Sequence, residues 1–196
     1  MKDLLPWLTV PAAWLLGGVS PGYWLVRLRT GGDVRAQGSG ATGATNAARV
    51  LGGGGFALVL LLDAVKGAVA AYGARLAGLA GGWEFAAAAA VVAGHVWPVQ
   101  LGFKGGRGFG PLLGAWLALA PLAIGGCLVL AGLGWAATRK KVYSALGGAL
   151  LLPVATWWET RSLPAAVFTT VTFGIVALAH RSHFVSPATA VPKPPP

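Results

Sequence analysis

The chain has 196 residues, of which 56% are hydrophobic and only 10% are charged. A soluble globular domain carries roughly 25% charged residues, so this composition excludes an ordinary soluble domain and predicts a protein solvated by lipid. The formal net charge of +10 is explained by membrane loops with a positive-inside bias and by anionic lipid headgroups, so nucleic acid is not expected as a partner.

The apolar segments predict an all-α, polytopic membrane protein of about seven transmembrane helices. They occupy residues 4–26, 50–80, 83–98, 110–137, 145–158 and 163–179. The first is too long for a signal peptide and is expected to be a span. A span needs about 20 residues, so 110–137 would hold two short helices that meet at Gly125–Gly126. We expect one membrane-embedded domain over 1–184 and a Pro-rich, disordered tail over 185–196.

The basic residues predict which side of the membrane each loop occupies. They gather between 27 and 49, at Lys104 and Arg107, at 139–141 and at Arg181. If these loops are cytoplasmic, the N-terminus lies outside and the C-terminus inside. The alternative, one long crossing by 110–137, would place the cluster at 139–141 outside and break the charge rule.

The first polar loop, residues 38–49, has the pattern of a phosphate-binding site. Its glycines allow successive backbone N–H groups to point at one anion, and a helix starting near Thr45 would add its positive end. Arg49 adds a planar cation suited to phosphate. The alternative is a flexible polar turn. The candidate ligands in this loop are Ser39, Gly40, Gly43, Thr45, Asn46 and Arg49.

A second glycine-rich loop contains Lys104, Gly105, Gly106 and Arg107 and follows His95 by a few residues. An ordinary positive-inside loop would explain its charges but not its glycines. His95 taken alone is typical of a helix end. No acidic residue stands at a ligand-like spacing from the histidines, so no metal site is expected.

Further polar groups lie in the second apolar stretch and after the last one. Asp63 and Lys66, three residues apart, share a helix face and can pair, which is how charges survive at membrane depth. A purely structural ion pair is the alternative. His180, Arg181 and His183 follow the last stretch. Four separate segments thus bring cations and hydroxyl groups to one membrane face, which predicts an anion site there.

In this order, the motifs resemble the small integral-membrane glycerol-3-phosphate acyltransferases of bacteria, the PlsY type that uses acyl phosphate. The resemblance runs from 20–23 through the first loop, Asp63-x-x-Lys66-Gly67 and the second loop, with its histidine, to Ser144 and His180–Arg181. It implies seven helices in the bacterial plasma (inner) membrane with a cytoplasmic active face. The implied substrates are acyl phosphate and glycerol 3-phosphate, with a soluble enzyme supplying the former. No cofactor is implied.

The resemblance also assigns roles to residues. It implies His95 and Lys104 as catalytic residues, with His95 a candidate general base. The implied substrate-binding residues are Ser39, Gly40, Gly43, Thr45, Asn46, Arg49, Lys66, Gly105, Gly106, Arg107, Ser144, His180, Arg181 and His183.

The chain departs from the family pattern at several positions. Ala41 and His183 stand where the family carries Asn, and Arg107 stands where it carries Lys, which keeps the charge but alters its geometry. These departures leave open a re-specialised or inactive paralogue. A small phosphate-ester transporter is a further alternative, disfavoured because the sequence has no internal repeat and its polar groups cluster at one face.

Overall fold

The computed structural model describes residues 4–79 and 81–183, and these residues form α-helices and short 3₁₀ turns without any strand. The predicted tail at 185–196 lies outside the described residues. The helices are α1 (Leu5–Gly18), α2 (Pro21–Thr30), η2 (Val34–Ala36), α3 (Ala44–Leu76), α4 (Trp83–Val96), η3 (Val99–Leu101), α5 (Phe109–Leu119), α6 (Pro121–Thr138), α7 (Lys141–Leu150), α8 (Leu152–Thr160), α9 (Leu163–Ala179) and η4 (Arg181–His183).

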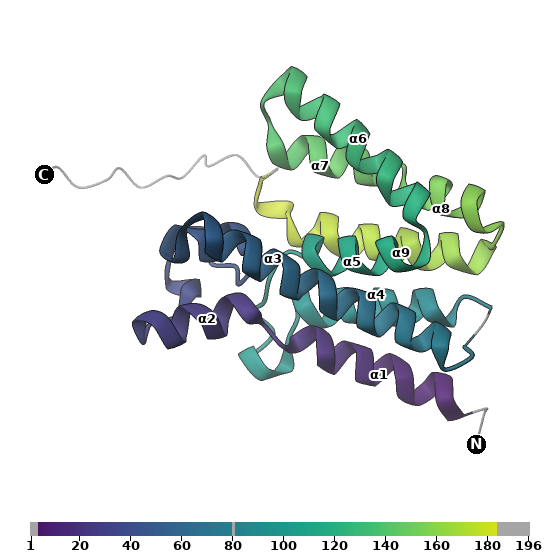
Figure 1. Cartoon of the computed structure of the whole chain (residues 1–196), viewed down its shortest axis with the longest axis horizontal. Coiled ribbons are helices and arrows are strands. Elements are labelled where there is room, and N and C mark those ends of the chain that lie inside the picture. The colour runs from purple at the N-terminus through teal and green to yellow at the C-terminus, as the bar shows by residue number, and fades with distance from the viewer. Residues whose placement is uncertain (1–3, 80, 184–196) are drawn as a thin grey trace, which may run out of the picture.

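The long helices lie roughly alongside one another, as Figure 1 shows. Helix α1 begins at the right-hand end of this view, and α9 finishes at the left-hand end. The connections from α1 to α3, from α4 to α5 and from α6 to α7 all lie towards the left-hand end. The polar loops of the sequence therefore share one end of the helical bundle.

The first and the fourth apolar stretches are each divided into two helices. The stretch 4–26 is divided into α1 and α2 at Ser20, and Pro21 takes the first position of α2. The pair expected to meet at Gly125–Gly126 instead separates at Ala120, and both glycines lie inside α6. Pro121 explains this correction, because proline lacks a backbone N–H and its fixed φ suits the first position of a new helix.

Close helix contacts in the bundle depend on glycine. A Cβ on Gly94 of α4 would overlap the backbone carbonyl of Trp14 in α1. A Cβ on Gly114 of α5 would likewise overlap the backbone carbonyl of Ala64 in α3. Small residues at such crossings let two helix backbones approach closely, as in bilayer proteins generally.

Helix α4 forms the centre of the fold. It packs against α1, α3, α5 and α9, and most of its residues, including Phe85 and the run 86–89, are buried. Beside it, the fully buried Trp116 donates from its indole nitrogen to the Thr156 hydroxyl at 3.1 Å. This hydrogen bond satisfies the indole N–H, which would otherwise be costly to bury.

The outer faces of the bundle are apolar. Large side chains of α3, such as Leu61 at 59% exposure, and of α6, such as Val129 at 63%, point away from the core. Among the described helices, α3 and α6 are both long and apolar enough to cross a bilayer, while α5 and α9 are shorter apolar helices. An exposed apolar surface of this extent is typical of a protein in contact with lipid.

Candidate active site

The two glycine-rich loops are joined to each other at one end of the bundle. The Thr42 backbone N–H donates to the Gly105 carbonyl at 3.2 Å, and the Arg35 guanidinium donates to the Leu101 carbonyl at 2.8 Å. Arg35 also pairs with Asp33 at 2.7 Å, and this hydrogen bond holds the pKa of the Asp33 carboxyl below its ordinary value. The pair therefore fixes the first loop against the second.

The Asn46 side chain organises the first loop from within. Its amide nitrogen lies 2.8–3.0 Å from three carbonyl oxygens, those of Val34, Gln37 and Ala41. Its oxygen accepts the Ser39 backbone N–H at 3.1 Å. Gly38, at a φ of +54°, lets Asn46 come this close, because a Cβ there would overlap the amide oxygen. Asn46 thus uses its polar atoms to shape the loop.

Helix α3 begins at this loop. Its first position is Ala44, and the Gly43 that precedes it offers no side chain to cap the N-terminal N–H groups. The positive end of the helix therefore faces the space enclosed by the loop. Thr45 and Arg49, on the first turns, line the same space.

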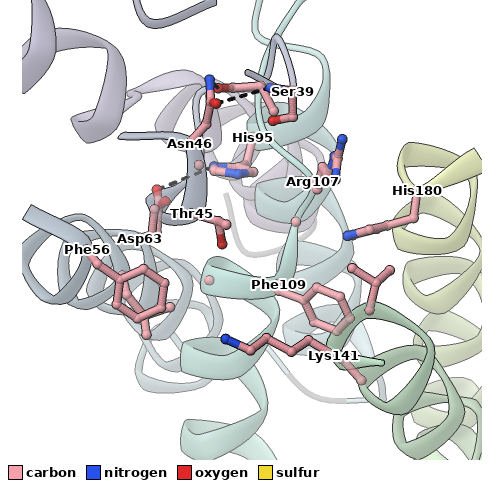
Figure 2. Close-up of a pocket in the computed structure, with 18 of the residues that line it drawn as sticks. Ser39, Thr45, Asn46, Phe56, Asp63, His95, Arg107, Phe109, Lys141 and His180 are labelled. Carbon is pink, nitrogen blue, oxygen red and sulfur yellow. Dashed lines mark hydrogen bonds and ion pairs between the residues drawn. The ribbon is translucent and has the colours of Figure 1, made fainter. Parts of the chain in front are cut away.

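Two neighbouring cavities occupy this end of the molecule, and they share Ser39, Ala41 and Arg107 in their walls. The larger has a volume of about 370 Å³ and the smaller about 230 Å³. Figure 2 shows residues of the larger cavity, which come from both glycine loops and from α3, α7 and the end of α9. The charged and imidazole groups lining the larger cavity are Arg49, Asp63, His95, Arg107, Lys141, His180 and His183, and the cations of the smaller are Lys104, Arg107 and Arg181.

One side of the larger cavity is apolar. Its apolar lining comes from Phe56 and Leu60 of α3, Phe109 of α5 and Val142 of α7. The smaller cavity also has apolar neighbours in Val96, Trp97 and Phe103, but the rest of its lining is mainly glycine loop and basic side chains. The larger cavity can therefore hold an anion that carries an apolar chain, and the smaller can hold a second, fully polar anion beside it.

The segment after α9 closes the site through histidines. His183 contacts the Arg107 guanidinium, and the His180 and His183 rings stack with centroids 5.9 Å apart. Burial lowers the pKa of His183, and the positive charge of Arg107 lowers it further. Tyr143 of α7 donates to the His183 carbonyl at 2.8 Å, which anchors the segment over the cavity.

A buried ionic group lies behind the larger cavity. Lys66 pairs with Asp63 at 2.8 Å, and its ammonium lies 2.9 Å from Nδ1 of His95. The three side chains are 2–6% exposed. Of the three, Asp63 and His95 reach the cavity wall, while Lys66 does not.

Comparison with known proteins places this arrangement in a family. The profile of the family described as glycerol-3-phosphate acyltransferase matches residues 7–187. Glycerol-3-phosphate acyltransferase 1 of Desulfitobacterium hafniense (strain Y51) is 42% identical over 87% of this chain and 85% of its own length. A relative with the same function in its name, from Synechococcus sp. (strain JA-2-3B'a(2-13)), is 43% identical over 89% and 86%. The chain belongs to the glycerol-3-phosphate acyltransferase family.

The fold of the family is confirmed by solved structures. The glycerol 3-phosphate form of PlsY, an integral membrane glycerol 3-phosphate acyltransferase, superposes with a TM-score of 0.84 at 27% identity, covering 91% of this chain and 90% of that one. Its lysophosphatidic acid form gives 0.82 at 26% identity, covering 91% and 89%. This acyltransferase-family chain is accordingly an all-helical membrane protein, as its sequence predicted.

Most residues singled out from the sequence meet at the two cavities of this family member. Ser39, Gly43, Thr45, Asn46, Arg49, His95, Arg107, His180 and His183 line the larger one, and Ser39, Gly40, Lys104, Gly105, Gly106, Arg107 and Arg181 line the smaller. Lys66 and Ser144 line neither. The Ser144 hydroxyl donates to the Lys140 carbonyl at 3.0 Å, and Lys66 is enclosed by protein groups.

The structure adds cavity residues that the sequence analysis left out of the site. Lys141 reaches the larger cavity, although the sequence only grouped it with a basic cluster. Phe56 and Phe109 supply apolar wall, and nothing in their local sequence distinguishes them from other core or lipid-facing residues. Asp63 lines the cavity as well as forming the ion pair predicted for it.

Proposed function

We propose that this chain transfers a fatty acyl group from acyl phosphate to the sn-1 hydroxyl of glycerol 3-phosphate. The relatives' names and the glycerol 3-phosphate and lysophosphatidic acid forms of PlsY support this acceptor and product. The observation that carries the proposal is the pair of cationic cavities that share Arg107. Such a pair holds two phosphate groups side by side, which is what this reaction requires.

The cavities differ in a way that assigns the substrates. Acyl phosphate fits the larger cavity, because Phe56, Leu60 and Phe109 offer apolar contact to the first part of its chain. Glycerol 3-phosphate fits the smaller cavity, whose lining includes the cations of Lys104 and Arg181 and the glycines of both loops. Arg107 stands between the two phosphates and reduces their mutual repulsion.

The chemistry needs no covalent enzyme intermediate, because the acyl phosphate is already an activated mixed anhydride. The acceptor hydroxyl oxygen attacks the acyl carbon, the bond from that carbon to the phosphate oxygen breaks, and the phosphate leaves with the electron pair. The hydroxyl proton passes to a phosphate oxygen. The products are 1-acylglycerol 3-phosphate and inorganic phosphate. Catalysis comes from positioning and from cations that stabilise the departing phosphate.

The proposed topology has seven spans in the bacterial plasma membrane. They are α1, α3, α4, α5, α6, α7 together with α8, and α9. The cavities and the basic loops then face the cytoplasm, with the N-terminus outside and the C-terminus inside. Residues 1–184 form the membrane domain in this proposal. A soluble enzyme that makes acyl phosphate must supply the donor on the cytoplasmic side.

An acyl-transfer assay tests the activity. Purified protein in lipid nanodiscs, given synthetic palmitoyl phosphate and radiolabelled glycerol 3-phosphate, is expected to form labelled 1-acylglycerol 3-phosphate and an equal amount of phosphate. A preparation that is folded but forms no labelled lipid would overturn the proposed function.

Two lysine variants test the assignment of the cavities. A lost charge-assisted contact is worth about 1.5–3 kcal/mol, or roughly 10- to 150-fold in kcat/KM. Lys104→Ala is expected to lose this mainly through KM for glycerol 3-phosphate, and Lys141→Ala mainly through KM for acyl phosphate. Arg75→Ala, whose guanidinium bonds to carbonyls at the end of α5, is the control. Changes below threefold at both lysines would contradict the assignment.

A further inference from the structure

The buried group of Asp63, Lys66 and His95 has a hydrogen-bonding pattern that fixes the state of the histidine. The Lys66 ammonium lies 3.0 Å from the Gly17 carbonyl oxygen and 2.7 Å from that of Val19, both at the end of α1. It also lies 2.9 Å from His95 Nδ1 and 2.8 Å from the Asp63 carboxylate. One ammonium thus joins α1, α3 and α4 directly behind the larger cavity.

The donor hydrogens of the Lys66 ammonium determine which ring nitrogen of His95 carries the proton. An ammonium has three hydrogens to donate and no lone pair to accept. The hydrogen bonds of Lys66 go to the Gly17 and Val19 carbonyls and to His95, while the Asp63 carboxylate contacts the ammonium as an ion pair only. Nδ1 of His95 therefore accepts from Lys66, because an N–H on that nitrogen would face another donor at 2.9 Å. The distance from Nδ1 to Asp63, 3.4 Å, is the longer of the two. A neutral imidazole that accepts through Nδ1 carries its proton on Nε2.

Nε2 lies at the boundary between the two cavities. A Cβ on Gly106 would overlap Nε2, so this nitrogen is directed at the loop that lines the smaller cavity. His95 itself lines the larger one. In Figure 2 the ring edge away from Asp63 points towards Arg107, which stands in both walls. An N–H in this position can donate to a phosphate or acyl oxygen, but it cannot accept the proton of the attacking hydroxyl.

We infer that Asp63 and Lys66 are positioning residues that hold His95 as a neutral hydrogen-bond donor through Nε2, and that His95 acts on the substrate as this donor and not as a general base. The inference rests on the proposed acyl transfer for its catalytic part. It assigns Lys66, which the sequence suggested as a substrate ligand, a role through His95. Donation by Nε2–H to the departing phosphate or the developing oxyanion stabilises charge that grows during the reaction.

Nitrogen NMR of the folded protein tests the tautomer without any activity measurement. Protein labelled with ¹⁵N-histidine is recorded in nanodiscs, and His95→Gln identifies the His95 signals by their loss. Protonated and unprotonated ring nitrogens resonate far apart, and His95 is expected to show a protonated Nε2 and a bare Nδ1. His180 is the internal reference: its Nδ1 lies 2.8 Å from the Val176 carbonyl, which only accepts, so its proton belongs on Nδ1. A protonated Nδ1 on His95 would overturn the inference.

Substitution at Lys66 tests the positioning role. In Lys66→Met the donor to Nδ1 is gone, so the Asp63 carboxylate is free to accept from Nδ1–H, and the His95 tautomer is expected to reverse. kcat is expected to fall at least tenfold. An unchanged His95 spectrum in this variant would contradict a positioning role for Lys66.

A pair of histidine variants tests the donor role in case Lys66→Met does not fold. The amide nitrogen of Gln can reach the position of Nε2, whereas that of Asn is shorter by one methylene and cannot. His95→Gln is expected to keep at least ten times the kcat of His95→Asn, because a donor is restored and a base is not. Equal loss in both variants would contradict the donor role. If neither the variants nor the parent protein transfers acyl groups, the proposed function fails while the NMR result still stands.

Discussion

Arg107 occupies an unusual position for a single residue, because its side chain belongs to the walls of both cavities. Burial lowers the pKa of its guanidinium, yet an arginine keeps its charge at any pH of the cell. We expect Arg107→Ala to raise KM for both substrates by severalfold or more, unlike the lysine variants. Arg107→Lys, which keeps the charge but loses the planar fork, should lie between. Steady-state kinetics with each substrate varied in turn would give both KM values. A change in KM for only one substrate would contradict a role of Arg107 in both cavities.

Asn46 is a second residue whose effect follows from its contacts. It is 2% exposed, and its amide nitrogen faces three carbonyl oxygens. Asn46→Asp replaces the amide nitrogen with an oxygen, which would face the carbonyl oxygens without a hydrogen between them. We expect this to lower the free energy of unfolding by about 1–3 kcal/mol or more. We expect a lower Tm and a loss of activity, measured by thermal unfolding in detergent and by acyl transfer. Thr45→Val, on the exposed side of the same turn, is the control for stability. A Tm equal to that of the parent would show that Asn46 does not organise the loop.

At the scale of helices, the contact between α3 and α5 depends on Gly114. A methyl group there would overlap the Ala64 carbonyl, so the helices would have to separate. We expect Gly114→Ala to destabilise the protein by about 1–3 kcal/mol through overpacking. Gly132→Ala in α6 is the matched control, since a Cβ there meets open space. Thermal unfolding of the two variants compares the same substitution at the two sites, and equal stability would show that no close crossing exists at Gly114.

The ion pair of Asp33 and Arg35, which fixes the first loop against the second, predicts a dependence of stability on pH. The pKa of Asp33 is lowered in the folded state, mainly by its hydrogen bond to Arg35. Its contribution is therefore present above the ordinary carboxyl value of 3.8 and is lost as the pH falls through the lower folded pKa. The Tm of the parent should fall as the pH drops below about 4, and Asp33→Asn should make this fall shallower. Near neutral pH, the slope of Tm against pH should be nearly the same in both proteins. Identical profiles of Tm against pH would show that Asp33 does not contribute to the pH dependence of stability.

At the scale of the whole molecule, the proposed topology places the two ends of the bundle on opposite sides of the membrane. In a Cys127→Ala background, single cysteines are introduced at Ala137, near the basic cluster, and at Ala77, after α3. Both positions are exposed at helix ends. An impermeant thiol reagent applied to whole cells should label the cysteine at 77 and spare the one at 137 until the membrane is opened. Labelling of both from the same side would rule out an odd number of spans between them.

The sequence determined the class of this protein, because composition and local patterns are enough for it. Low charge and long apolar stretches indicated lipid contact, and glycines mixed with cations in two loops predicted an anion near each. The predicted position of the helix break in 110–137 was wrong, because this stretch contains two helix-breaking sequences. Gly125–Gly126 suggested the break, but the new helix begins at Pro121, whose nitrogen carries no hydrogen to donate within a continuing helix. Such choices depend on which break lets the apolar faces pack, and that is not a local property.

Only the tertiary structure decided how the polar residues divide their work. The sequence predicts Asn46 and Lys66 as substrate ligands. In the structure the Asn46 amide also contacts loop carbonyls, and the Lys66 ammonium contacts the Gly17 carbonyl and His95. Lys141 looked like one more basic loop residue, yet it lines the larger cavity. A side chain's role depends on which groups the fold places in contact with it. Such a partner can lie far away in the chain, as Gly17 lies 49 residues from Lys66. Residue type and spacing reveal the chemistry available, but the packing of α1, α3 and α4 determines which of these polar groups bond to one another.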